Sequence, residues 1–358
     1  MINSKILTIG IPTYNGALRI RETIDSIAPQ MGPDCEILVS DNASGDTTQE
    51  VVLELSKKYP GLISYHRNDK NLGFDGNLNA IFDHALGRYV WLFGDDDVLN
   101  PGSVLAVRPL LEKDLDYIFV NYSHCEHDLS IRQIRSSWFH RLSSPVDISS
   151  VIALVGTDIC FVSAHIFKRS AWSKDAEHFI GKGYLHVEKC LSLAALPKAR
   201  AWALSFPLVL RREGTSANAL EWQKDREFVV LMHSRVLAIT AFYQKCLSPL
   251  AFSRLKNSAA RFFLFQVYQA RRLGCVFSDE RKSEIEKNLS SFPRLIHFYE
   301  QIMRSPIWIV TLIYWTHKSV WRLEVLIKIF RCGDWRDIFE TLRMIVRRVK
   351  VKRPSGHL

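Results

Sequence analysis

Short apolar runs separated by turn residues fill the first part of the chain, and segments of helical period stand between them. Each run has the length of a strand. The predicted strands are Lys5–Ile11, Cys35–Ser40, Leu62–His66, Tyr89–Phe93 and Tyr117–Asn121, and the predicted helices are Ala17–Ala28, Thr47–Tyr59, Gly76–Leu86 and Gly102–Glu112. Strands that alternate with helices predict a mostly parallel sheet covered by helices on both faces, an α/β fold.

Later segments extend this pattern and then change it. Strands are predicted at Ile159–Phe167, Ala199–Leu204 and Pro207–Leu210. A helix from Tyr184 to Leu196 is predicted after Gly181-Lys-Gly183. Long helical segments follow at Phe228–Tyr243, Ala251–Leu273 and Glu280–Leu289. Thr47 and Glu50 have the spacing of a capping box. We therefore expect an α/β catalytic domain over residues 1–218 and a helical region over 219–358.

Three adjacent acids, Asp95, Asp96 and Asp97, follow the strand that ends at Phe93. Carboxylates this close repel one another, so a cation or a ligand carrying one is expected to neutralise them. The carboxyl end of a strand is also where open α/β sheets bind ligands. A solvated acidic turn with a helix cap is the plainer alternative.

Other nucleotide and hydrolytic motifs are missing from the chain. Gly10 and Gly16 have the wrong spacing for a dinucleotide fingerprint or a P-loop, and neither a His-Glu-x-x-His nor a Gly-x-Ser-x-Gly motif occurs. A hard cation held by the acidic cluster would bridge two phosphates and stabilise a departing nucleoside diphosphate.

Four motifs in order resemble those of family 2 glycosyltransferases with the GT-A fold. They are Ile9-Gly-Ile-Pro-Thr-Tyr-Asn15, Val39-Ser-Asp-Asn-Ala-Ser-Gly-Asp46, Asn71-Leu-Gly73 and Gly94-Asp-Asp-Asp-Val-Leu-Asn-Pro-Gly102. The resemblance covers about residues 5–215. Phe161-Val-Ser-Ala-His-Ile-Phe-Lys-Arg169 and His186-Val-Glu188 further resemble the abequosyltransferase-like subset of O-antigen enzymes, for which the donor sugar would be a deoxy or dideoxy sugar.

The resemblance implies a donor site for a nucleotide sugar and a divalent metal, Mg²⁺ or Mn²⁺. It places the nucleoside against Pro12, Thr13 and Tyr14, with Asn15, Asn71 and Gly73 in the same donor-binding motifs, and it places the base against Asp41. Asp95, Asp96 and Asp97 would take the ribose and the metal. Gly94 stands where the family commonly has Asp, so the division of these roles among the three carboxylates stays open.

Two further groups of candidates follow from the resemblance. Family members carry an acidic base at the head of a helix after a Gly-containing loop, which makes Glu188 the first candidate for the catalytic base and His186 the second, because imidazole titrates near neutrality. Arg211 and Arg212 occupy the place of a loop that closes over the diphosphate, and arginine forks suit phosphate. A charge at a helix start and a solvated basic turn are the plainer alternatives.

Composition limits the setting. The 358 residues are 47% hydrophobic and 23% charged, as in ordinary globular proteins. Seven scattered cysteines without a Cys-x-x-Cys pair argue against a disulfide framework or zinc ribbon, and the first apolar run is short for a signal peptide. His124-Cys-Glu-His127 is expected to be a solvated loop rather than a metal site. We expect a cytoplasmic protein.

The net charge of +10 is concentrated at the end of the chain. Residues 301–358 hold 12 Lys and Arg against 4 Asp and Glu, and tryptophans and aliphatic residues lie among them. The most apolar window, Pro306–Trp315, is too short to span a bilayer. Basic, Trp-rich segments are typical of helices in an anionic membrane interface, so we expect residues 304–353 to bind the inner face of the cell membrane and an acceptor that is lipid-linked.

Two other functions fit parts of the sequence. A basic protein with exposed aromatic residues could bind a membrane or nucleic acid on a degenerate fold of this kind, but the acidic cluster would repel a phosphate backbone, so no nucleic acid is expected. A metal-dependent nucleotidyltransferase would also use an α/β sheet. It would need a Gly-rich loop with Lys or Arg near the first strand, and Thr13-Tyr-Asn-Gly16 is not one.

Overall fold

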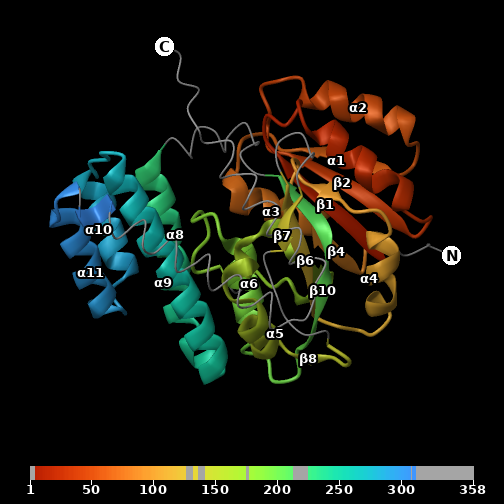
Figure 1. Cartoon of the computed structure of the whole chain (residues 1–358). Helices are drawn as coiled ribbons and strands as arrows, with labels where there is room; N and C mark the ends of the chain where they lie inside the picture. The colour runs from red at the N-terminus through yellow and green to blue at the C-terminus, as the bar shows by residue number, and fades with distance from the viewer. Residues whose placement is uncertain are drawn as a thin grey trace, which may run out of the picture.

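The computed structural model describes residues 5–125, 132–135 (backbone only), 142–174, 177–212, 225–307 and 309–311. An α/β part runs to Arg212, and helices from Arg226 onward pack together at one side of it (Figure 1). The predicted boundary near residue 218 and most of the predicted interface segment 304–353 lie outside the described residues.

A mixed sheet of ten strands organises the α/β part. The strands are β1 (Leu7–Thr13), β2 (Cys35–Asp41), β3 (Ile63–Arg67), β4 (Tyr89–Leu92), β5 (Val98–Leu99), β6 (Tyr117–Cys125), β7 (Arg132–Arg135), β8 (Val146–Asp147), β9 (His165–Lys168) and β10 (Arg200–Arg212). Their order is β3-β2-β1-β4-β9-β6-β10-β5, with β7 on β6 and β8 on β10. β3, β2, β1 and β4 are parallel neighbours, as predicted.

Six helices precede or cover strands of this sheet. They are α1 (Ile20–Ile27), α2 (Thr48–Lys58), α3 (Gly73–His84), α4 (Ser103–Leu111), α5 (Ile148–Val155) and α6 (Leu185–Leu193). Every residue of β1 and β2 is buried, so both faces of the sheet are covered there. A Cβ on Gly10 would lie 2.4 Å from Ile81 Cγ2, so glycine lets α3 lie directly on β1. The predicted α/β class is confirmed.

The predicted strand Ile159–Phe167 is mostly not a strand. Residues Gly156–Cys160 and Val162–Ala164 form 3₁₀ turns, and only β9 pairs, antiparallel to both β4 and β6. A short apolar run does not distinguish a strand from buried turns, because both bury their side chains. These turns bring Ser163 beside the end of β4, which matters for the site below.

The two predicted strands Ala199–Leu204 and Pro207–Leu210 form one strand, β10. It pairs in parallel with β6, and its register shifts between Leu204 and Pro207 and again before Val209. Pro207 has no N–H to donate, so the ladder is interrupted there without ending the strand.

The predicted capping box at the start of α2 is not formed. Thr47 caps no backbone group, and the Asp46 carboxylate instead accepts the N–H of Thr48 at 3.0 Å together with its hydroxyl. An aspartate two residues before a free N–H can accept it through an Asx turn, which competes with the box.

Four helices follow the sheet among the described residues. They are α8 (Arg226–Phe242), α9 (Pro249–Arg272), α10 (Asp279–Asn288) and α11 (Pro293–Arg304), and the first three match predicted segments. Buried side chains such as Phe263, Phe277 and Tyr299 form their own core, and α5 contacts α9. No helix within the described ranges is long and apolar enough to cross a membrane.

Candidate active site

The acidic cluster occupies the turn between β4 and β5, as the sequence predicted. The Asp95 carboxylate accepts the hydroxyl of Thr13, the last residue of β1, at 2.6 Å. The Thr23 hydroxyl lies 3.0 Å from the carbonyl oxygen of Asp95 and 2.8 Å from that of Asp97. The turn is therefore held by β1 and α1, next to the strand that carries the predicted nucleoside motif.

The Asp97 side chain points away from the one of Asp95 and is almost fully buried. Its carboxylate accepts the Ser163 hydroxyl at 2.5 Å and the backbone N–H of Arg212 at 3.3 Å. The Arg212 guanidinium donates to the Asp96 carbonyl at 3.1 Å and forms an ion pair with Glu22 at 2.5 Å. Arg212 thus ties the end of β10 to the acidic turn and to α1. Its predicted contact with the diphosphate stays a prediction.

Burial raises the pKa values of two of the three carboxyls. The pKa of Asp95 is raised to about 7, first by loss of solvent and second by the charge of Asp96, although the side chain is partly exposed by surface area. The same two causes raise the pKa of the Asp97 carboxyl well above its usual range. Full ionisation of the cluster at neutral pH therefore calls for a cation.

The three carboxylates do not converge as one set of metal ligands. Nowhere in the described part of the chain do three or more His, Cys, Asp or Glu side chains meet. A Cβ on Gly94 would lie 2.9 Å from the Asp97 carboxylate and 3.2 Å from that of Asp96, so these two lie over Gly94 while Asp95 turns to Thr13. Successive side chains in a turn diverge. A metal here would have one or two carboxylates and take other oxygens from its ligand.

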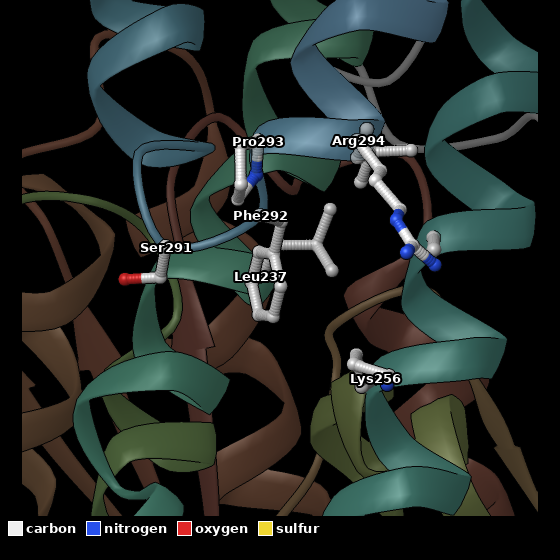
Figure 2. Close-up of a pocket in the computed structure, with 8 residues that line it drawn as sticks. Leu237, Lys256, Ser291, Phe292, Pro293 and Arg294 are labelled. Atoms are coloured by element: carbon white, nitrogen blue, oxygen red, sulfur yellow. The ribbon is translucent and has the colours of Figure 1, made fainter.

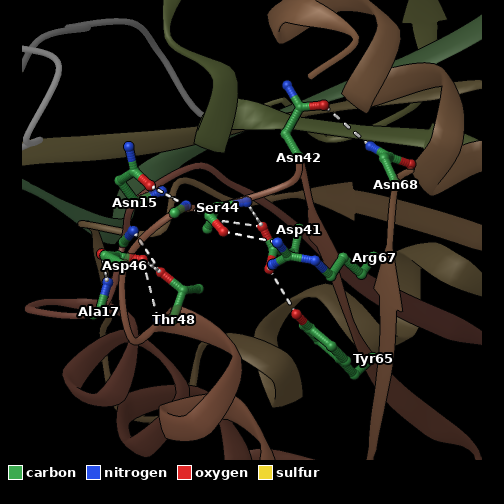
Figure 3. A network of polar contacts seen from close by, with 12 residues as sticks. Asn15, Ala17, Asp41, Asn42, Ser44, Asp46, Thr48, Tyr65, Arg67 and Asn68 are labelled. Atoms are coloured by element: carbon green, nitrogen blue, oxygen red, sulfur yellow. Dashed lines mark hydrogen bonds and ion pairs between the residues drawn. The ribbon is translucent and has the colours of Figure 1, made fainter. Parts of the chain in front are cut away.

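Asp41 lies at the end of β2 and is completely buried in a polar network (Figure 3). One oxygen accepts the Ser44 N–H and hydroxyl at 2.8 and 2.5 Å, and the other accepts the Tyr65 hydroxyl at 2.6 Å and the Arg67 guanidinium at 2.8 Å. Burial and the neighbouring Asp41 raise the pKa of Tyr65 to about 12. Asp41 thus presents a neutralised, rigid group rather than a free carboxylate.

Tyr65 and Arg67 were not predicted as site residues. Their signal was present in the register, because Arg67 pairs with Asp41 across β2 and β3 and Tyr65 lies two residues before it on the same face. The guanidinium of Arg67 also donates to the Ser44 carbonyl at 2.8 Å. A sequence reading that lacks strand register cannot place these two side chains beside Asp41.

The remaining donor motif residues shape the loops around this edge. The Asn15 amide oxygen accepts the Gly45 N–H at 2.8 Å, and Asn15 has a positive φ of 56°. The Asn42 amide donates to Asn71 at 2.8 Å and to the Gly73 carbonyl at 3.1 Å. Pro12 is buried in β1 and Tyr14 is partly exposed beyond it. The structure thus brings these motifs to one edge of the sheet.

Arg211 extends in another direction from Arg212. Its guanidinium lies 5.2 Å from the Phe161 ring centre, a cation–π distance. Burial raises the pKa values of Asp97 and Tyr184, and the positive charge of Arg211 is close enough to both groups to lower them. Arg211 therefore lies between the acidic turn and α6.

The first candidate base, Glu188, is a buried anchor in this structure. Its carboxylate is fully buried and accepts the backbone N–H groups of His178 and Phe179 at 2.8 and 3.1 Å and the Tyr243 hydroxyl at 3.2 Å. Burial raises its pKa, and these hydrogen bonds act against the rise. The carboxylate links α6 to the loop before it and to α8, so its geometry favours a structural role over contact with a sugar.

The second candidate, His186, lies on the same helix with one ring nitrogen available. Its Nε2 is 3.2 Å from the Cys160 carbonyl, which can only accept, so Nε2 carries the proton. Its Nδ1 is buried and has no hydrogen-bond partner among the residues described. Burial lowers the pKa of His186 to about 4, which keeps the ring neutral at pH 7.

Asp75 of α3 is a further residue that the sequence did not point to. Its carboxylate accepts the N–H groups of Gly183 at 2.8 Å and Leu185 at 3.1 Å, so it caps the start of α6 from another helix. Gly183 has a positive φ of 82°, which glycine adopts without strain. The Gly-containing loop and the helix it precedes are thus fixed by α3.

Known proteins resemble this chain in the region that contains Asp95–Asp97. Residues 8–171 match the family model described as glycosyl transferase family 2. These residues form a family 2 glycosyltransferase domain. The domain contains β1, β2 and β4 with Thr13, Asp41 and Asp95–Asp97, whereas β10 and α6 lie beyond the match.

Two curated relatives extend the comparison of this transferase domain. The chain is 28% identical over 301 residues to abequosyltransferase RfbV of Salmonella typhimurium, which covers 79% of this chain and 88% of the relative. It is 31% identical over 115 residues to the Campylobacter jejuni GalNAc(5)-diNAcBac-PP-undecaprenol beta-1,3-glucosyltransferase, covering 32% of this chain and 37% of that protein. The predicted resemblance to the abequosyltransferase-like subset is confirmed.

Solved structures show the same fold. Staphylococcus aureus TarS 1-349 in complex with UDP-GlcNAc has a TM-score of 0.53 at 15% identity and covers 89% of this chain and 92% of its own. The mannosyltransferase PcManGT of Pyrobaculum calidifontis, in complex with GDP-Man and Mn²⁺, has a TM-score of 0.50 at 16% identity and covers 97% and 88%. The predicted GT-A class followed by helices is confirmed.

The raised pKa of Asp95 has a measurable consequence. Between its unfolded value of 3.8 and about 7, the folded protein holds a proton that the unfolded chain releases, so this group lowers the unfolding free energy as pH rises. We expect Asp95→Asn, which cannot ionise, to be more stable than the parent at pH 8 without divalent metal and nearly equal to it at pH 4. Urea unfolding in a chelator at both pH values measures this.

The exposed Asp69→Asn serves as the control for that experiment, since its carboxylate lies at the surface. A stability difference between Asp95→Asn and the parent that is the same at pH 4 and pH 8 would contradict the burial argument.

Glu188→Gln should destabilise the fold. Glutamine has one acceptor oxygen and turns an NH₂ group toward two backbone N–H donors, which we expect to cost about 2 kcal/mol of unfolding free energy. Tyr243→Phe removes a single donor to Glu188 and should cost about 1 kcal/mol. Urea unfolding compares the two, and a Glu188→Gln variant as stable as the parent would argue against the anchoring role.

Proposed function

We propose that this protein transfers a sugar from a nucleotide-diphosphate sugar to a hydroxyl group of a lipid-linked glycan, in the assembly of a bacterial surface polysaccharide. The observation that carries the proposal is the meeting of Thr13, Asp41 and the Asp95–Asp97 turn at one edge of the sheet. Parallel neighbours end at the same edge, so one extended ligand can lie along the edge that carries all three. The family 2 domain supplies the class of reaction.

Each end of this edge suits one part of the donor. The partly exposed Arg67, held by the buried Asp41, suits the base together with the half-buried Tyr14. Asp95, beside Thr13, suits the ribose hydroxyls. Asp96 and Asp97, which lie over Gly94, are then the carboxylates on the diphosphate side. The way the turn separates the three side chains supports this proposed division.

A divalent metal, Mg²⁺ or Mn²⁺, fits the diphosphate side. The buried Asp97 has a raised pKa, and a nearby cation would let it ionise. When bound, such a metal would stabilise negative charge on the leaving nucleoside diphosphate. The relative PcManGT holds Mn²⁺ in its complex with GDP-Man, which supports the same choice here.

Binding of nucleotides tests the donor proposal directly. A thermal-shift and calorimetric screen of UDP, TDP, CDP, GDP and their sugars should find at least one that binds only with Mg²⁺ or Mn²⁺. Asp96→Asn should weaken that binding about tenfold or more, because it removes a charge from the metal side. The exposed Asp69→Asn should leave it unchanged. A parent that binds no nucleotide with either metal would end the transferase proposal.

We further propose His186 as the base that takes the acceptor proton. The acceptor oxygen would lose its proton to Nδ1 and attack the anomeric carbon, and the bond from that carbon to the nucleoside diphosphate would break, with inversion as in related family members. The free lone pair on Nδ1 and the location at the start of α6 support this role. Glu188, with its oxygens engaged, then holds the helix that carries His186.

His186→Asn should lower turnover by about a hundredfold or more while the nucleotide that the screen identifies still binds with parental affinity. Turnover is measured as nucleoside diphosphate release with membrane extract as acceptor. Tyr243→Phe, which disturbs only the Glu188 anchor, should retain most activity. Full activity of His186→Asn would contradict this role and favour Glu188 as the catalytic base.

The acceptor and the membrane complete the proposal. The Campylobacter relative is named for an undecaprenol-linked substrate, and the RfbV relative for abequosyl transfer. An enzyme with such an acceptor must reach the membrane surface. The basic residues beyond 304 would supply this contact, through attraction to anionic lipid.

A further inference from the structure

A cavity of about 340 Å³ lies in the helical region, away from the acidic turn (Figure 2). Its walls come from α8, α9 and the connection into α11. It is lined by five apolar residues, one serine and two cations: Leu237, Ala260, Phe292, Pro293 and Leu295, with Ser291, Lys256 and Arg294. Figure 2 labels Lys256 on α9 and Arg294 on α11 beside this space, and the Lys256 ammonium also lies 5.6 Å from the Phe252 ring centre.

The charges of this cavity are unbalanced. No acidic side chain lines it, and in the described part of the chain neither Lys256 nor Arg294 forms an ion pair. Two other cations of the helical region do form ion pairs, Arg235 with Glu284 at 3.1 Å and Arg281 with Asp225 at 2.5 Å. Arg294 is exposed and Lys256 is half-buried, so both can be reached from solvent. Two reachable cations beside an apolar floor without a carboxylate suit a ligand that brings its own negative charge.

The neighbouring surface indicates what kind of anion fits. Phe298 follows Arg294 by four residues on α11, so the two lie on the same face of that helix, and Phe298 is 53% exposed. Leu237 on the cavity floor is fully buried. A cation above an apolar floor and beside an exposed aromatic ring matches the boundary between lipid headgroups and acyl chains.

We propose that this cavity binds the phosphate headgroup of an anionic membrane phospholipid. Lys256 and Arg294 contact the phosphate oxygens, and the half-buried Phe292 and Leu295 pack against the first carbons of the lipid. The volume suits a headgroup with a short apolar segment rather than a whole lipid. The site lies outside the donor machinery, so the proposal stands independently of the transfer reaction.

Binding of a soluble short-chain lipid to the full chain tests this. Dihexanoyl phosphatidic acid, titrated calorimetrically below its micelle concentration, should bind at one site per chain. The double variant Lys256→Ala and Arg294→Ala should weaken this binding about tenfold or more, because it removes both cations. Arg294→Glu alone should weaken it similarly. Lys245→Ala, an exposed cation outside the cavity, should leave it unchanged.

Two further titrations separate the sources of phosphate. Inorganic phosphate alone and zwitterionic dihexanoyl phosphatidylcholine should each bind at least about tenfold more weakly than the phosphatidic acid. Equal binding of inorganic phosphate would overturn the lipid proposal in favour of a plain anion site. Absence of binding by the parent, or unchanged binding in the double variant, would overturn it entirely. None of these results depends on nucleotide binding at Asp95–Asp97.

Discussion

Repulsion among three successive carboxylates at a buried strand end is the constraint on which the site depends. The fold reduces it by turning Asp95 toward Thr13 and Asp97 toward Ser163 and the Arg212 backbone. Each of these partners comes from a different part of the chain, so the turn connects β1, the 3₁₀ segment before β9, and the end of β10. Burial, and after it the charge of Asp96, raises the pKa values of Asp95 and Asp97, and a bound cation is the natural way to let both ionise.

The other side of the site depends on how α6 is held. Asp75 caps the helix from α3, and Glu188 binds the preceding loop and Tyr243 of α8. Lys182, in that loop, and Arg235, on α8, share Glu284 of α10. The helical region is therefore part of the architecture that positions the start of α6. A buried carboxylate without hydrogen-bond partners would destabilise the fold. This cost explains why the Glu188 carboxylate accepts hydrogen bonds from several groups.

Gly94 shows how one small residue alters a common motif. The family more often has an acid at this position, and here the space over Gly94 is taken by the carboxylates of Asp96 and Asp97. A side chain at 94 would collide with them. Asp95, which accepts the Thr13 hydroxyl, is the carboxylate next to β1. The carboxylates are held in this arrangement by contacts with neighbouring strands, which the motif itself does not contain.

The sequence by itself determined the α/β class, the first four parallel strands, the long helices after residue 225 and the position of Asp95–Asp97 at a strand end, because periodicity and turn residues act locally. The tertiary structure alone decided that residues 156–164 turn before β9, that Arg67 neutralises Asp41, and that Asp75 caps α6. It also decided that Glu188 and His186 are both buried, and that Nδ1 of His186 has no hydrogen-bond partner among the described residues. These facts depend on contacts between segments far apart in the chain, which no local pattern encodes.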